Sequence, residues 1–68
     1  MKGFIEVHCE LINMVDNSVE YYKVSININN INLYRNNYIL CNTGDIVTPF
    51  DIKESYEEIK ELIKQAQS

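Results

Sequence analysis

Residues 55–66 read SYEEIKELIKQA, and this stretch decides one layer of the fold. Its apolar side chains recur at helical spacing and form one stripe, which consists of Tyr56, Ile59, Leu62, Ile63 and Ala66. Ser55 and Glu58 have the spacing of a capping box, which predicts where the helix begins. Because so short a helix is only marginally stable alone in water, we expect it to lie on a sheet.

The remainder of the chain predicts that sheet. Along residues 2–12, polar and apolar side chains alternate with a period of two, and the core face is expected to carry Ile5, Val7, Cys9 and Leu11. A second strand, over about residues 19–26, is expected to direct to the core Tyr22, Val24, Ile26 and Ile28. Three short strands follow at residues 31–35, 38–42 and 46–48. The last is expected to end at Pro49 or to lie at a sheet edge, since proline lacks the ladder donor.

Together these elements predict one small α+β domain over residues 1–68. Its expected architecture is a four- to five-stranded antiparallel β-meander with one C-terminal amphipathic helix packed on the sheet. A chain of 68 residues has room for a single, modest core.

Charge and hydropathy narrow the function classes. The net charge is −4 and the chain has only six Lys and Arg residues, so nucleic acid is not the expected default partner. The chain shows no apolar run near the length that crosses a bilayer and no signal-peptide pattern at its start. We therefore expect a cytoplasmic protein that has no membrane partner.

The residues most able to do chemistry do not form a recognisable site. His8 and Cys9 are neighbours on a strand and point to opposite faces, so they are not expected to bind one metal ion or to act as a nucleophile pair. Cys9 and Cys41 lie in strand-like segments and are predicted to be buried reduced thiols rather than a disulfide. The acidic residues near the helix start, including Glu54, are expected to be solvated. The sequence therefore predicts no catalytic residue, no metal site, no cofactor and no enzyme activity.

Tyrosine is the one surplus residue type for a chain of this length. Some of the five tyrosines must fill the core, but a sheet covered by one helix leaves its other face open. The aromatic and basic residues predicted to form an interaction surface there are Phe4, Tyr21, Tyr34, Arg35 and Tyr38.

A set of features between residues 22 and 66 forms a familiar series. It consists of residues 24–27 (VSIN), Ile31, Tyr34, a hairpin with Gly44, and residues 52–59 (IKESYEEI). In this series the chain resembles the small flagellar and swarming-motility (FlbD-like) protein family. The resemblance implies a bacterial accessory or regulatory protein, and it carries over no catalytic residue.

Two functions are compatible with these observations. The first is a non-enzymatic module that acts through protein contact, as a homo-oligomer or with another protein. The alternative is a sheet-based nucleic-acid-binding or transcription-regulatory module, in which exposed residues such as Tyr34, Arg35 and Tyr38 stack on bases.

Overall fold

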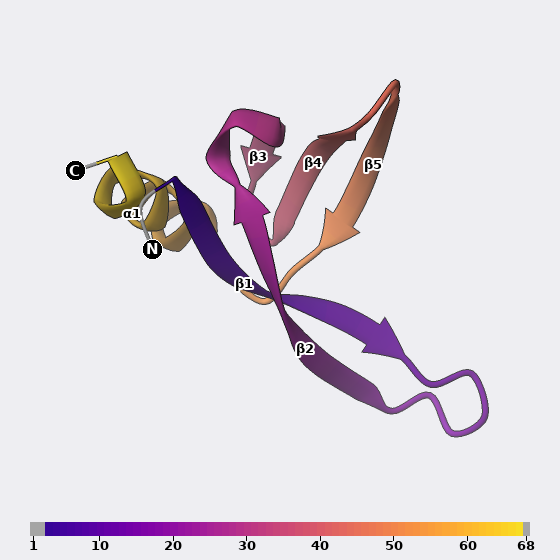
Figure 1. Ribbon diagram of the computed structural model, residues 1–68. Helices are drawn as coiled ribbons and strands as arrows, with labels where there is room; N and C mark the ends of the chain where they lie inside the picture. The colour runs from indigo at the N-terminus through magenta and orange to yellow at the C-terminus, as the bar shows by residue number, and fades with distance from the viewer. Residues whose placement is uncertain (1–2, 68) are drawn as a thin grey trace.

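The computed structural model describes residues 3–67 and consists of five β-strands, a short 3-10 turn and one helix (Figure 1). In chain order these are β1 (Phe4–Ile12), β2 (Val19–Asn27), η1 (Ile28–Asn30), β3 (Ile31–Arg35), β4 (Tyr38–Thr43), β5 (Ile46–Asp51) and α1 (Tyr56–Gln67). The α+β class, with antiparallel strands and a C-terminal helix, is therefore confirmed. Lys2, where the first strand was predicted to begin, lies outside the described residues.

The strands form two antiparallel sheets and do not continue as a single meander. β1 and β2 form a two-stranded hairpin, whereas β3, β4 and β5 form a three-stranded sheet in that order. The change of direction occurs at η1, where the Asn27 side chain accepts a hydrogen bond from the main-chain N–H of Asn29. One isolated antiparallel bridge, between Cys9 and Ile52, connects β1 to the end of the second sheet.

Asparagine and glycine shape the tight turns. Asn17 and Asn37 have φ angles of 59° and 61°, and Gly44 has a φ of 68°. Asparagine tolerates this left-handed region better than other side chains, and glycine enters it without steric cost. These three residues lie in the connections between β1 and β2, β3 and β4, and β4 and β5, so turn chemistry sets each hairpin.

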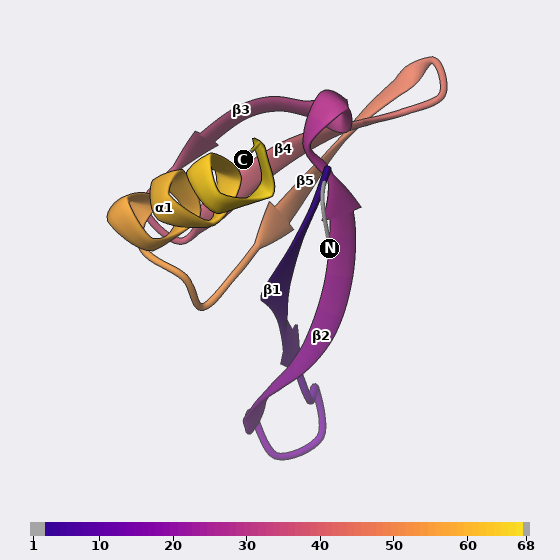
Figure 2. The same ribbon diagram turned by 60° about the vertical axis from the view of Figure 1, so that its left-hand side comes forward.

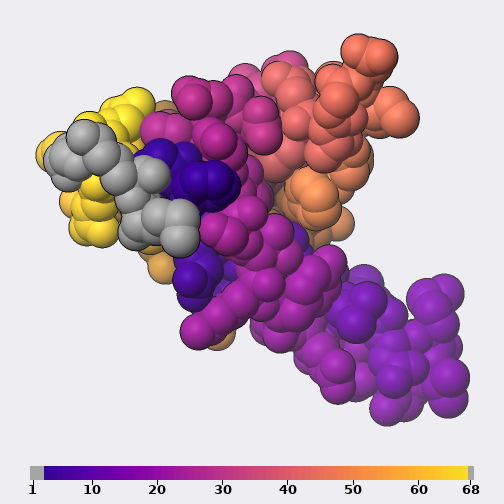
Figure 3. All heavy atoms as spheres, in the orientation of Figure 1, coloured from indigo at the N-terminus to yellow at the C-terminus, as the bar shows by residue number. Residues whose placement is uncertain are grey.

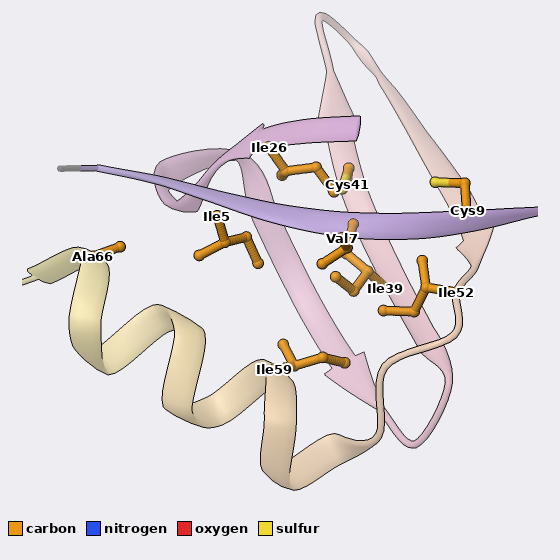
Figure 4. Packing of buried hydrophobic residues seen from close by; sticks show 9 residues of the cluster. All are labelled: Ile5, Val7, Cys9, Ile26, Ile39, Cys41, Ile52, Ile59 and Ala66. Atoms are coloured by element: carbon orange, nitrogen blue, oxygen red, sulfur yellow. The ribbon is translucent and has the colours of Figure 1, made fainter. Parts of the chain in front are cut away.

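The core lies where the two sheets and the helix meet. It is a cluster of Ile5, Val7, Cys9, Ile26, Ile39, Cys41, Ile52, Ile59 and Ala66 (Figure 4). Figure 4 shows Ile59 directed from α1 toward the strands that carry Val7 and Ile39. At the far end of the helix, the main-chain N–H of Gly3 donates to the carbonyl of Ala66 at 3.0 Å. β1 and α1 therefore shield each other's buried side chains from solvent.

The helix begins as the sequence predicts. The Ser55 hydroxyl accepts a hydrogen bond from the Glu58 N–H at 3.3 Å, and the Glu58 carboxylate accepts one from the Ser55 N–H at 3.2 Å. This reciprocal arrangement is a capping box, and it satisfies two backbone donors that the helix itself cannot. Within residues 3–67, no helix has both the length and the apolar character needed to span a bilayer.

Three expectations about the strands need correction. Leu11 and Tyr22, both predicted for the core face, are 53% and 47% exposed, because the hairpin extends beyond the core. β5 continues through Pro49 to Asp51 and does not end at Thr48. It lies at the edge of its sheet, which is the second of the two alternatives that Pro49 left open, and there a missing donor costs little.

Truncating the same face of β1 at two places should test where the core ends. Ile5 is 3% exposed and Leu11 is 53% exposed, although both point to the same side of the strand. Ile5→Ala should lower the free energy of unfolding by about 2–5 kcal/mol, while Leu11→Ala should change it by about 0.5 kcal/mol or less. Urea unfolding followed by circular dichroism measures both. Equal losses would mean that the core extends along the whole hairpin.

Candidate functional site

The junction between β1 and the segment that connects β5 to α1 is the most elaborate polar feature of the molecule. The Glu54 carboxylate accepts a hydrogen bond from the main-chain N–H of His8 at 2.9 Å. Its other oxygen lies 2.7 Å from the Nδ1 atom of His8. The carbonyl of His8 in turn accepts from the N–H of Lys53 at 2.8 Å. One residue of β1 therefore binds two consecutive residues of the connecting segment.

Asn37, in the turn between β3 and β4, holds the same segment from the other side. Its side-chain amide donates to the carbonyl of Lys53 at 2.9 Å and to that of Glu54 at 3.1 Å. Its main-chain N–H also donates to Glu54, and its carbonyl accepts from Ile52. The left-handed conformation of Asn37 places both its main chain and its side chain against the segment. Both sheets are thus tied to the start of the helix.

Glu54 was expected to be solvated with the other acids of this region, and that expectation is wrong. Its side chain is buried, and both of its oxygens bind His8. Burial raises the pKa of the Glu54 carboxyl, but the hydrogen bonds from the side chain and main chain of His8 lower it by more, so the net pKa lies below the ordinary value. Glu54 is therefore an ionised acceptor, and Nδ1 of His8 must be the donor.

The two cysteines are buried and form no disulfide, as predicted. Burial raises the pKa of both thiols; the charge of Glu54 adds to this effect at Cys9. Since the thiolate is the reactive form, neither group is activated as a nucleophile. His8 is turned toward Glu54, and Cys9 lies in the core on the opposite side of β1.

The five residues of the predicted interaction surface lie in three separate places. Phe4 and Tyr21 lie on the face of the hairpin that points away from the core, where the Lys53 ammonium lies 5.5 Å from the centre of the Tyr21 ring. Arg35 and Tyr38 are paired across β3 and β4 on the outer face of the three-stranded sheet. Tyr34 points inward, and its ring stacks on that of Tyr56 at 5.2 Å.

The pair on the outer face has a defined geometry. The guanidinium carbon of Arg35 lies 4.8 Å from the centre of the Tyr38 ring, as in a cation–π contact. One face of that ring is therefore covered, and Tyr34 is not available beside it. The structure does not bring together the three residues that a base-stacking platform was expected to use.

The sequence did not reveal the most exposed apolar feature, which is the far half of the hairpin. Every residue from Leu11 to Lys23 is exposed, and this arm projects from the body of the molecule (Figure 3). It carries seven exposed large apolar residues, Leu11, Ile12, Met14, Val15, Val19, Tyr21 and Tyr22. We call residues 11–23 the arm. A usable signal was its length: nine-residue strands reach further than a small core can cover.

A cleft lies between the two sheets, close to where the arm leaves the body. Its volume is about 200 Å³. One wall comes from the second half of β2, including Val24 and Ile26, and the other from β4 and β5, including Cys41 and Phe50. The walls are predominantly apolar, so the cleft would accept a hydrophobic side chain more readily than a charged ligand.

Comparison of the chain with protein-family models, with curated proteins and with solved structures gave no match. Function therefore has to be inferred from the geometry. Within residues 3–67, no three His, Cys, Asp or Glu side chains come together in a way that could hold a metal ion. The His8–Glu54 junction has the character of a structural clasp, because each carboxylate oxygen accepts a hydrogen bond from His8.

Removing the charge of Glu54 should destabilise the fold in a pH-dependent way. Glu54→Gln should lower the free energy of unfolding near pH 7 by about 1–3 kcal/mol, because the two partly buried donors of His8 lose a charged acceptor. Glu61→Gln, on the exposed side of the helix, is the matched control and should change it by about 0.5 kcal/mol or less. Urea unfolding at several pH values measures both variants.

The sign of the pH effect follows from the direction of the pKa shift. In the unfolded chain Glu54 titrates near its ordinary value of about 4.3, and in the folded chain it titrates below that value. Its contribution is therefore fully present above about pH 4.3 and is lost as the pH falls through the folded pKa. The difference between the wild-type protein and Glu54→Gln should shrink in that range. A difference that stays constant down to pH 2 would contradict the ionised clasp.

Proposed function

We propose that this chain is a non-enzymatic accessory or regulatory protein that acts through contact with other protein molecules, beginning with its own copies. The observation that carries the proposal is the apolar arm. Of the twelve exposed large apolar residues among residues 3–67, seven lie on the arm and only five on the remainder of the described surface. Such a concentration on a small protein is typical of an interaction surface.

The two residues at the end of the arm are the most exposed of these apolar residues. Met14 and Val15 are 87% and 94% exposed at the end of the arm, where nothing in the described chain packs on them. Scattered apolar residues on a surface need no explanation, but a projecting segment that carries most of them does. Burying these side chains against another protein removes their apolar area from water, which favours association.

The domain itself also gains from association. A domain of this size buries a smaller fraction of its surface than a larger one, so its own core contributes modest stability. Contacts with a second molecule add burial that the single chain cannot supply. The resemblance to small flagellar and swarming-motility proteins supports the bacterial, accessory character of the proposal, and the occupied clasp at His8 and Glu54 supports a role other than catalysis.

The arm can be tested by making its end polar. Met14→Ser combined with Val15→Ser should weaken self-association by about ten-fold or more, because each lost apolar burial is worth about 1.5–3 kcal/mol and 1.4 kcal/mol is a factor of ten. The control is Ile46→Ser, which removes a 68% exposed apolar side chain at the turn between β4 and β5. Light scattering on a sizing column, over a concentration series, gives the mass of each protein.

We expect the wild-type mass to rise above 8.0 kDa as the concentration increases, and Ile46→Ser to behave like the wild type. A wild-type protein that stays at 8.0 kDa over the whole series would contradict self-association. An assembly that forms equally well in the arm variant would contradict the arm as the contact surface.

A further inference from the structure

The edges of the strands differ in how well they are protected. The outer edge of β1 is covered at His8 by Lys53 and Glu54, and before its start by the bond between Gly3 and Ala66. β5 is a six-residue edge strand interrupted by Pro49. β2 is nine residues long, contains no proline, and is the outer strand of the hairpin, because β1 lies between it and α1 (Figure 2). Long, unprotected edges of this kind template pairing with another strand.

The hydrogen bonds at the two ends of the hairpin show which backbone groups of β2 point outward. At one end Asn13 donates to the carbonyl of Ser18, and at the other Ile28 donates to the carbonyl of Gly3. Antiparallel pairs alternate between hydrogen-bonded and non-hydrogen-bonded positions. Counting inward from either end along the register gives the same result. Even-numbered residues of β2 bond to β1, and odd-numbered residues point away from it.

The opposite strand confirms this alternation. His8 occupies a non-hydrogen-bonded position of β1, opposite Lys23, and its N–H and carbonyl are indeed directed outward to Glu54 and Lys53. On β2 the equivalent outward groups belong to Val19, Tyr21, Lys23 and Ser25. Among residues 3–67, no group forms hydrogen bonds with these outward N–H and carbonyl groups in the way that Glu54 and Lys53 do with those of His8. Four successive outward positions are therefore available to a second β-strand.

We propose that two copies of this chain join edge to edge through β2, antiparallel, around a two-fold axis at Tyr22. This deepens the proposed function and rests on it. Outward groups pair only when odd residues lie opposite odd residues, which restricts the register. An axis at Lys23 would oppose two lysines, and an axis at Glu20 would oppose two glutamates, both of which are destabilising. An axis at Tyr22 opposes the two Tyr22 rings and places Lys23 against Tyr21.

This register pairs residues 19–25 of one copy with residues 25–19 of the other without opposing like charges, whereas an axis at Tyr21 pairs only residues 19–23. An axis at Val24 gives an overlap of the same length, over residues 21–27, but centres it on the part of β2 that lines the cleft beside β4 and β5. Aromatic cross-strand pairs are among the more favourable contacts on a sheet surface. The two hairpins then form one four-stranded antiparallel sheet, which exceeds the two strands that are marginal alone.

The same register brings the end of the arm to the cleft of the other copy. Continuing the pairing beyond the strands places Ser18 beside Ile26 of the second copy, and Asn17 beside its Asn27. Ile26 and Asn27 line the cleft of about 200 Å³ between the sheets. The adjacent apolar end, Met14 and Val15, thus arrives at an apolar cleft of matching character. Each copy carries an arm and a cleft, and the two-fold axis places the arm of each copy at the cleft of the other.

Amide hydrogen exchange on the unmodified protein tests this pairing. The N–H groups of Glu20, Tyr22 and Val24 bond to β1 and should be protected at every concentration. Those of Tyr21 and Lys23 should exchange quickly at low concentration. As the mass measured by light scattering doubles, their exchange should slow in proportion to the monomer that remains. Exchange rates read residue by residue by nuclear magnetic resonance distinguish the two groups.

A pair of variants at one position provides a second readout. Lys23→Pro removes an outward N–H without removing a bond to β1, and should remain folded but lose the dimer. Lys23→Ala keeps the backbone donor and should still dimerise. If Lys23→Pro fails to fold, the exchange measurement on the wild-type protein still shows whether β2 pairs with a second copy.

The outcomes separate this inference from the proposed function. If the protein reaches dimer mass while Tyr21 and Lys23 still exchange quickly, the β2 pairing is overturned and association through another surface stands. If Lys23→Pro is folded and dimerises like Lys23→Ala, the pairing is overturned as well. A protein that remains monomeric at every concentration overturns both.

Discussion

The contact between Glu54 and His8 is the constraint on which the arrangement of this molecule depends. Two sheets and a helix in so short a chain have few residues with which to hold one another in place. The connection from β5 to α1 passes the middle of β1, and there the two oxygens of one buried carboxylate bind the side chain and the main chain of one histidine. Asn37 holds the same connection from the other sheet. The residues close in sequence to this contact, Cys9 and Ile52, form the bridge between the sheets, and both belong to the core cluster with Ile59.

Local patterns in the sequence predict the elements well, because each depends on neighbours along the chain. The capping box at Ser55 and Glu58, the alternation in β1 and the asparagine and glycine turns are all of this kind. The division into two sheets and the burial of Glu54 were not predictable in the same way. Glu54 lies three residues from the exposed acids Asp51 and Glu57, and its partner is 46 residues away. Nothing in the spacing of residues 51–58 signals that one of their carboxylates faces a histidine on the first strand.

The predicted interaction surface also shows what local sequence patterns cannot indicate. Aromatic residues were expected to gather on one open face, yet the five chosen residues lie in three places and Tyr34 packs inward on Tyr56. Alternation indicates correctly which face of a strand is apolar, but it does not indicate how far along the strand the core extends. Ile5 and Leu11 share a face, and only Ile5 is covered. The arm exists because the strands are longer than the core, which is a property of the assembled molecule and not of either strand.

The hydrogen bond between Gly3 and Ala66 has a consequence for how this protein is made. Synthesis delivers β1 first, but the groups that cover it, from Ile52 to Ala66, are the last described part of the chain to be added. Until then the growing chain exposes an apolar strand and an unprotected hairpin edge, which are the features that chaperones bind and that promote aggregation. The native core can close only after the helix has left the ribosome. Each hairpin needs only its own two strands, whereas closure of the core waits for Ile59 and Ala66, because these residues belong to the last element of the fold.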